Sequence, residues 1–330
     1  ILSHAGLEYI VPGGFGVTIF FFLSGYLIST LLRIEFEKHG AISFKAFYLR
    51  RTVRIIPPLL ICYGLVLFLM ASGIFALPVN WSGVWWDVVF LTNYAPLAER
   101  SGVPILLWSL NVEEHFYIAF PVLFAVLLGR PARLQALAIG SLIGLALAFR
   151  MIELDRGSGD LIQHWTHTRF DAILFGVLLT IDQGRGKGWG NGMGWLLLGL
   201  ALLLFSFVFR DEYFRATFRY TIQGIGLFFV FKVMIEGKLR ILQAPLRSYP
   251  LKRIADWSYV LYLIHLPLVM LVGQRLANAP ASVSFTIGIL LSVVFAMAME
   301  RWVEGPLYRW RRRIEAGLHP AGALRPKAIE

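Results

Sequence analysis

Charged residues are scarce in this chain, and cysteine occurs only once. Of its 330 residues 15% are charged, against about a quarter in soluble domains, while 57% are hydrophobic. No polar block is long enough to fold alone, so the composition excludes an ordinary soluble enzyme and indicates one membrane domain. Cys62 lies within an apolar stretch, which excludes a disulfide framework and makes packing its expected role.

Several motifs that would indicate other chemistries are also missing. No cysteine or histidine cluster has the spacing of a structural metal site, and no Gly-x-Ser-x-Gly nucleophile elbow occurs. The glycine-rich segment 184–194 lacks the Lys-Ser/Thr context of a phosphate-binding loop. The net charge of +11 would suit nucleic acid, but the basic residues lie between apolar stretches rather than on one patch. We therefore expect no metal and no nucleic-acid partner.

What the sequence has instead is a series of apolar stretches, each close to the length that crosses a bilayer. A spanning helix needs about 20 mostly apolar residues, so we expect an all-α, polytopic transmembrane helix bundle surrounded by membrane lipids. Residues 1–7 read as the end of a further helix that is truncated in this sequence, which brings the expected number of spans to ten. The other stretches are 14–32, 55–76, 108–128, 134–149, 170–182, 193–209, 219–236, 256–276 and 284–304.

Lysine and arginine are distributed unevenly among the loops. They accumulate in the cytoplasmic loops of membrane proteins, and with ten alternating spans one set of loops contains 21 of them and the other set five. We therefore expect both termini in the cytoplasm, in a bacterial inner membrane, with 1–304 as the membrane domain and 305–330 as a basic cytoplasmic tail. The basic set comprises 33–54, 129–133, 183–192, 237–253 and 305–330.

The loop 77–107 belongs to the other set and is rich in tryptophan. Trp81, Trp85, Trp86 and Tyr94 suit a helix that lies in the membrane interface, where aromatic rings collect. The alternative is that 84–98 spans the membrane, but this would invert every later loop and destroy the charge asymmetry. We therefore expect an interfacial segment.

His4 is expected near the outer end of the truncated first helix. Its unperturbed pKa lies near 6.5, so a neutral imidazole that can remove a hydroxyl proton is available at physiological pH. The alternative is a histidine that only packs and forms hydrogen bonds.

Arg50, Arg51 and Arg54 form a cluster directly before the apolar stretch 55–76. If they lie at a helix start, their guanidinium groups and the helix dipole would suit a phosphorylated ligand. Anchoring to lipid headgroups is the alternative for the cluster.

Glu113 and Glu114 occur next to His115 inside the apolar stretch 108–128. Each ionised group costs about 2.5–3.5 kcal/mol at the centre of a membrane helix, so the pair needs compensation and is a functional candidate. One carboxylate would orient an imidazole such as that of His4. The alternative is an internal ion pair with an arginine, for instance Arg169.

Three further polar groups are expected mainly to hold helices together. For Arg169 and Asp171 a structural salt bridge is favoured. Ser258, Tyr262 and His265 share a predicted helix face, where His265 either lines a substrate path or forms a hydrogen bond between helices. Glu300 and Glu304, before Gly305-Pro306, are expected to pair with basic-loop arginines near a helix end.

In their order along the chain these residues resemble the acyltransferase-3 family of integral-membrane O-acyltransferases. The resemblance extends over nearly the whole sequence. Its pieces are His4, Gly14-Phe15-Gly16-Val17, Phe22-Leu23-Ser24-Gly25-Tyr26-Leu27, Phe47-Tyr48-Leu49-Arg50-Arg51 with Arg54 and Pro57, Trp108-Ser109-Leu110, Val112-Glu113-Glu114, Phe116-Tyr117, Arg169-Phe170-Asp171, Ser258-Tyr259 with Tyr262 and His265, and Glu304-Gly305-Pro306.

The resemblance implies transfer of an acyl group from cytoplasmic acyl-coenzyme A to a hydroxyl of a carbohydrate, lipid-linked sugar or secondary metabolite. It implies His4 as catalytic. Our hypothesis is that His4 acts either as base or as acyl carrier, with Glu113 or Glu114 orienting its imidazole. The resemblance assigns the donor phosphates to Arg50, Arg51 and Arg54. The expected substrate path is lined by Trp108, Ser109, Arg169, Tyr259 and His265.

The sequence departs from the family pattern at two places. The basic residue that usually lies about ten positions before the histidine is absent from this sequence, and His115 replaces the more common glutamine. The other classes of protein considered are a transporter or flippase and a scaffold. A transporter predicts repeat symmetry, which the sequence does not show, and a scaffold gives no reason for so many charges inside spans.

Overall fold

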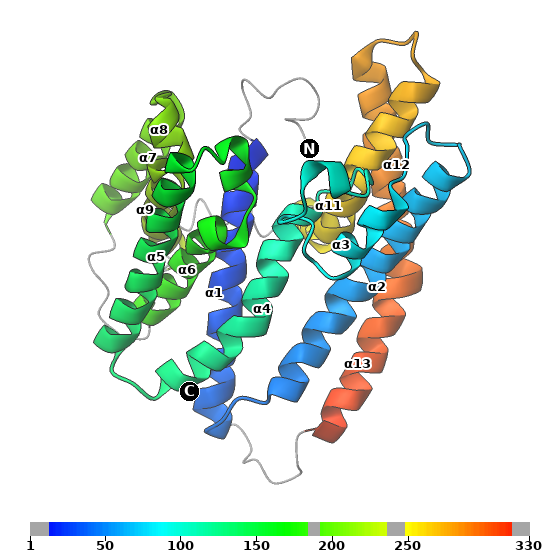
Figure 1. Ribbon diagram of the computed structural model, residues 1–330. Helices are drawn as coiled ribbons and strands as arrows, with labels where there is room; N and C mark the ends of the chain where they lie inside the picture. The colour runs from blue at the N-terminus through cyan, green and yellow to red at the C-terminus, as the bar shows by residue number, and fades with distance from the viewer. Residues whose placement is uncertain (1–12, 184–191, 236–247, 319–330) are drawn as a thin grey trace.

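The computed structural model describes residues 13–183, 192–235 and 248–318, and within these ranges the chain forms helices and no strand. Figure 1 shows the long helices side by side. The prediction of an all-α bundle is therefore confirmed. The long helices are α1 (Gly13–His39), α2 (Phe44–Ala71), α4 (Leu107–Leu128), α5 (Ala132–Asp155), α6 (Thr166–Gln183), α7 (Met193–Val208), α9 (Phe218–Ile235), α11 (Tyr249–Arg275), α12 (Ala281–Met299) and α13 (Gly305–Leu318).

Most of these helices are long and apolar enough to cross a membrane. In the described ranges seven segments meet both conditions: α1, α2, α4, α5, α9, α11, and α12 together with its continuation to Ile314. Helix α7 is apolar but shorter, and α6 carries Arg169, Asp171 and Asp182. The polytopic architecture is confirmed, whereas the number of ten spans is not. The expected span at 1–7 lies outside the described residues.

The two ends of the bundle differ in charge. The α1–α2 and α4–α5 connections and the end of α13 lie at the lower end in Figure 1, and these are segments of the basic set defined by the sequence. We call this the basic end. The α5–α6 connection, the short helix α8 (Glu212–Ala216) and the α11–α12 turn lie at the upper end, which we call the opposite end.

Helix α2 begins earlier than the hydropathy predicts, at Phe44 rather than near residue 55. Ser43 caps it by accepting a hydrogen bond from the Ala46 N–H at 3.3 Å, and Pro57 and Pro58 lie inside the helix. Arg50, Arg51 and Arg54 are therefore well inside α2. The expectation that they mark a helix start is wrong, and the dipole of the first turn does not reach them.

The segment 77–107 folds as a loop with three very short helices, η2 (Trp81–Gly83), α3 (Val84–Val88) and η3 (Leu97–Glu99). The alternative of a span over 84–98 is excluded because α3 ends at Val88. Asp87 holds the loop together by accepting hydrogen bonds from Tyr63 at 2.7 Å and from Thr92 and Ser101 at 2.5 Å. Trp81 and Trp85 remain exposed at this surface, as an interfacial position requires.

The expected helix end near Glu304 is also wrong. A π-helical turn, η5 (Glu300–Glu304), joins α12 directly to α13. The Gly305 N–H bonds to the Glu300 carbonyl in this π-turn, and Pro306, which has no N–H to donate, follows directly after it. The expected ion pair of Glu300 does form: Arg253 donates to both its carboxylate oxygens at 2.8 and 2.6 Å.

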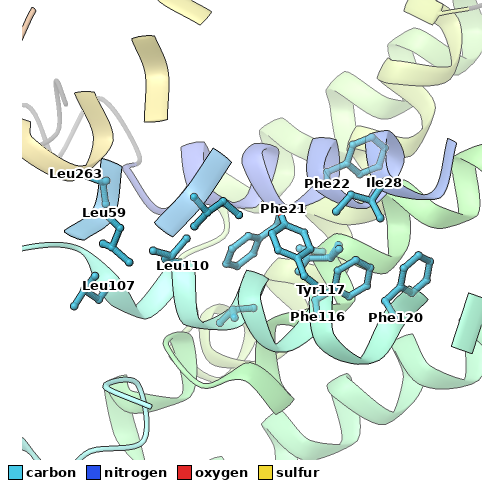
Figure 2. Packing of buried hydrophobic residues seen from close by; sticks show 14 of the residues in the cluster. Phe21, Phe22, Ile28, Leu59, Leu107, Leu110, Phe116, Tyr117, Phe120 and Leu263 are labelled. Atoms are coloured by element: carbon cyan, nitrogen blue, oxygen red, sulfur yellow. The ribbon is translucent and has the colours of Figure 1, made fainter. Parts of the chain in front are cut away.

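Helices α1 and α6 cross with their backbones in near contact. A Cβ atom on Gly25 would meet the carbonyl group of Ile173, and one on Gly176 would meet the backbone of Phe22 and Tyr26. Small residues allow such an approach between membrane helices. Below the glycines, the Ser29 hydroxyl donates to Thr180 at 2.7 Å. The crossing fixes α1, whose Phe21 faces Leu110, Phe116 and Tyr117 of α4 in Figure 2.

Replacing Gly176 by alanine should therefore destabilise the bundle, since overpacking typically costs about 1–3 kcal/mol. Gly140→Ala on α5 is the matched control. Nothing lies within 4 Å of its added methyl group, so the helix propensity of alanine should leave stability unchanged or raise it by up to about 1 kcal/mol. Thermal unfolding in detergent measures both variants, and equal midpoints would contradict the close crossing.

Candidate functional site

Glu113 lies in the interior of the bundle, where α4 faces α1. Its side chain is 2% exposed and accepts a hydrogen bond from the Ser24 hydroxyl. Ser24 is also 3.2 Å from the Tyr117 hydroxyl, one helical turn further along α4. The tight α1–α6 crossing at Gly25 holds the neighbouring Ser24 at this depth. A buried carboxyl group is thus held in place by two hydroxyl groups from two helices.

Arg51 of α2 supplies the positive charge closest to these groups. Its guanidinium carbon lies 5.1 Å from the ring centre of Tyr117 and 5.9 Å from that of Phe47. Its charge acts on both Glu113 and Glu114, yet no direct ion pair joins them in the described part of the chain. Oε1 of Glu114 is buried and has no hydrogen-bond partner there. We call Ser24, Arg51, Glu113, Glu114 and Tyr117 the carboxylate cluster.

The other two arginines of the predicted phosphate site point elsewhere. Arg50 forms an ion pair with Glu35 of α1 at 2.9 Å, and Glu35 also accepts the N–H of Ser43. Arg54 is exposed, and its charge acts on Glu304 at the end of η5. The three arginines therefore do not form a single phosphate-binding site. Arg50 ties α1 to α2, Arg51 belongs to the carboxylate cluster, and Arg54 remains accessible.

Asp171 and Arg169 are both buried, but they do not pair with each other. Asp171 forms an ion pair with Arg150 of α5 at 2.8 Å, and both side chains are fully buried. Arg150 also donates to the Thr168 carbonyl at 2.6 Å and to the Thr221 hydroxyl at 2.5 Å. The predicted salt bridge at Asp171 therefore forms, but with Arg150 rather than Arg169. This partner was missed because the predicted apolar stretch ended at residue 149, which placed Arg150 in the following loop.

Arg169 is stabilised by an aromatic ring rather than by a carboxylate. Its guanidinium carbon lies 3.7 Å from the ring centre of Tyr220, and Nη2 donates to the Thr18 hydroxyl at 3.1 Å. Among the described residues Arg169 forms no salt bridge with Glu113 or Glu114, so that alternative explanation of the glutamates is wrong. A stacked guanidinium replaces part of the lost hydration by cation–π attraction.

The polar residues of α11 connect it to its neighbours. The hydroxyl groups of Tyr262 and Ser109 are 2.5 Å apart, and Tyr259 donates to the Ile55 carbonyl at 3.0 Å. Nδ1 of His265 lies 2.8 Å from the Leu261 carbonyl of its own helix. Ser258 is exposed, so the predicted polar face narrows to Tyr262 and His265. Ser109 and Tyr259 thus act in helix contacts, and their expected place on a substrate path stays a prediction.

An aromatic and histidine-rich layer covers the opposite end of the interior. The Trp108 ring meets the His164 ring edge-on with centroids 4.8 Å apart, and His115 Nδ1 is 2.7 Å from the Thr166 hydroxyl. His164 lies in the loop before α6, and burial, with Arg100 and Arg169 nearby, lowers its pKa to about 4. This imidazole is therefore neutral at physiological pH.

His4 lies outside the described residues, and its catalytic role remains a prediction. The described residues contain no group of three or more histidine, cysteine or acidic side chains that could hold a metal ion. The expectation that the protein needs no metal likewise stays a prediction.

Comparison with known proteins identifies the chain. An acyltransferase domain matches residues 2–301. The chain belongs to the acyltransferase-3 family. Among its relatives are a Staphylococcus aureus (strain COL) protein named "Putative O-acetyltransferase" and the O-acetyltransferase OatA of S. aureus (strain NCTC 8325 / PS 47). Each is 28% identical and aligns with 93% of this chain and 54% of its own length. The chain thus spans about half the length of these relatives. No solved structure matches it significantly.

Replacing Asp171 by asparagine should destabilise the protein by about 3–5 kcal/mol, because Arg150 would remain buried without a counter-charge. The double variant Arg150→Met/Asp171→Leu should recover much of this loss, since neither charge is then buried. Arg156→Gln is the control: Arg156 is exposed and paired with Glu153, so its loss should change stability little. Thermal unfolding ranks the variants; an Asp171→Asn midpoint equal to that of the control would rule out a stabilising buried pair.

Proposed function

We propose that this protein is a membrane O-acyltransferase that moves an acyl group, such as acetyl, from acyl-coenzyme A to a hydroxyl group. The acceptor would be a carbohydrate, a lipid-linked sugar or a secondary metabolite. The observation that carries the proposal is the carboxylate cluster: two glutamates within an apolar bundle, one bonded to Ser24 and both within reach of the charge of Arg51, in a chain of the acyltransferase-3 family. Ionisable groups are rarely kept inside a membrane helix without a function.

In the proposed reaction His4 takes the proton of the acceptor hydroxyl while its oxygen attacks the thioester carbonyl. The C–O bond of the new ester forms, the C–S bond breaks, and the coenzyme A thiolate leaves and takes up the proton. In the alternative, His4 first accepts the acyl group and then passes it to the hydroxyl. Glu113 or Glu114 would orient the imidazole and stabilise its positive charge.

The donor would enter at the basic end, because coenzyme A carries phosphate groups. Arg54 is exposed on α2, about 15 Å along the helix from its start at that end, and is the most accessible member of the predicted arginine set. Helix α13 packs against α2 and adds Arg309, Arg311, Arg312 and Arg313 to the same end. Guanidinium groups match phosphate oxygens well. Arg50 would contribute less, since Glu35 already neutralises it.

The charge asymmetry of the loops supports a cytoplasmic basic end with both termini in the cytoplasm. The proposed location is a bacterial inner membrane. Acyl-coenzyme A would then reach the protein from the compartment into which the arginines project. The acyl group would leave toward the opposite end.

A direct test follows the fate of labelled acetyl-coenzyme A in membranes that contain the full chain. His4→Ala should abolish transfer, and Glu113→Gln should lower kcat by roughly 10²–10⁴-fold if the carboxylate supports proton transfer. Both should insert into the membrane normally. Glu37→Gln, at an exposed position on α1, should retain full activity. A wild-type protein without donor-dependent transfer would refute the proposed function.

A second prediction concerns the donor phosphates. Arg54→Gln should raise the KM for acetyl-coenzyme A about tenfold with little change in kcat, as expected when a charged hydrogen bond to bound substrate is lost. Arg130→Gln is the matched control, an exposed arginine at the same end in the α4–α5 connection. Initial rates at several donor concentrations measure the effect. An equal KM for both variants would remove Arg54 from the donor site.

A further inference from the structure

A pocket opens at the opposite end of the bundle, away from the basic loops. It lies between the end of α5, the short helix η4 (Gly159–Gln163), α8 and the start of α9, and its volume is about 390 Å³. Ligand pockets in proteins range over about 300–1,000 Å³, so this one suits a small molecule or one unit of a larger one. None of the predicted site residues lines this pocket.

The lining is polar and balanced in charge. Two acidic and two basic side chains face the pocket together with an amide and a phenol ring. Arg219 donates to the Tyr220 hydroxyl at 2.9 Å, whereas its Nε is buried without a partner in the described part of the chain. The polar residues used here are Asp160, Gln163, Glu212, Arg215, Arg219 and Tyr220.

Such a lining favours a neutral molecule with many hydroxyl groups. A hydroxyl group both donates and accepts hydrogen bonds, so it can satisfy carboxylates and guanidinium groups at the same time. A phosphate or other anion would be attracted by the two arginines and repelled by Asp160 and Glu212. The charge balance therefore distinguishes this pocket from the arginine-rich basic end.

The pocket also adjoins the polar interior of the bundle. The guanidinium carbon of Arg169 lies 3.7 Å from the ring centre of Tyr220, one of the lining residues, and Arg169 donates to the Thr18 hydroxyl of α1 at 3.1 Å. On another side η4 leads directly to His164, whose ring meets Trp108 at the start of α4. Two side chains, Tyr220 and Arg169, thus separate the pocket from Thr18 of α1, and His164 lies between η4 and Trp108 of α4. Helices α1 and α4 carry all members of the carboxylate cluster except Arg51.

We propose that this pocket binds the hydroxyl-bearing acceptor of the acyl transfer, and that the acceptor is a neutral polyol such as a sugar unit. The inference rests on the proposed function, which supplies the acyl group from the basic end. Arg219 and Gln163 would hold the hydroxyl groups beside Tyr220, and one hydroxyl would face the polar interior.

Blocking the pocket with a covalent label tests this placement. The sequence contains only Cys62, which is buried, so a cysteine introduced at the surface can be labelled selectively with a bulky maleimide. Ala216→Cys places the label in the pocket. Ser282→Cys places it at an exposed position in the first turn of α12 at the same end. Transfer of labelled acetyl from acetyl-coenzyme A to endogenous membrane acceptors is measured before and after labelling, together with binding of acetyl-coenzyme A.

Labelled Ala216→Cys should lose at least about tenfold in transfer, the loss expected when charged hydrogen bonds to the acceptor are prevented. Its binding of acetyl-coenzyme A should not change, and labelled Ser282→Cys should keep both properties. Full transfer by labelled Ala216→Cys would overturn the pocket proposal while leaving the proposed function intact. If the unlabelled wild type transfers no acetyl group, the proposed function itself fails.

The class of acceptor is tested by protection of the introduced cysteine. Methyl glucoside and N-acetylglucosamine at high concentration should slow the maleimide reaction of Ala216→Cys, and Arg219→Gln in the same background should weaken this protection. Inorganic phosphate at equal concentration should have no effect. Protection by phosphate alone, or by none of these probes, would overturn the assignment of a neutral polyol.

Discussion

The close crossing of α1 and α6 is the constraint on which the rest of the arrangement depends. Gly25 and Gly176 bring two backbones together at a distance that no side chain tolerates. Once that contact is fixed, Ser24 must face Glu113 on α4, and Thr18, less than two turns away on α1, must lie beside Arg169 of α6. The polar groups of three helices are thus placed by a contact that contains no polar side chain, because rigid helices transmit the position of the crossing along their length.

Buried charges in this bundle are compensated in three different ways. Asp171 has a direct ion pair with Arg150, and Arg169 has an aromatic ring and a hydroxyl group. Glu113 has hydroxyl partners, with Arg51 acting only over a longer distance. In the first two arrangements a counter-charge or an aromatic ring contacts the buried charge directly, which suits architecture, since removing one partner exposes an uncompensated charge. Glu113 and Glu114 have no direct counter-charge among the described residues, which is the reason to assign them to proton chemistry rather than to stability.

Hydropathy was sufficient to predict the all-α bundle and the approximate position of the described long helices other than α13, because apolar length is encoded locally. Helix α13 lies in the segment expected to be a basic tail. Hydropathy could not predict the helix ends that depend on capping and on irregular turns. These are the start of α2, which Ser43 caps, and the end of α12, where a π-turn precedes Pro306. The partner of Asp171 was missed for another reason. Whether Arg150 or Arg169 faces a given carboxylate depends on helix depth and rotation, and these are set by contacts between distant segments such as Gly176 and Phe22.

Depth along the helices also constrains how the two ends could cooperate. At 1.5 Å per residue, Ser24 lies about 22 Å from the basic end of α1 and about 16 Å from its other end, while Arg54 lies about 15 Å along α2 from the basic end. The accessible arginine and the carboxylate cluster therefore differ in depth by only about 7 Å. A donor whose phosphates stay near Arg54 would need to extend only its thioester arm to reach the cluster. The remaining distance would be covered by the acceptor from the pocket beside Tyr220, so that neither charged phosphates nor a polyol would have to cross the apolar middle of the bundle.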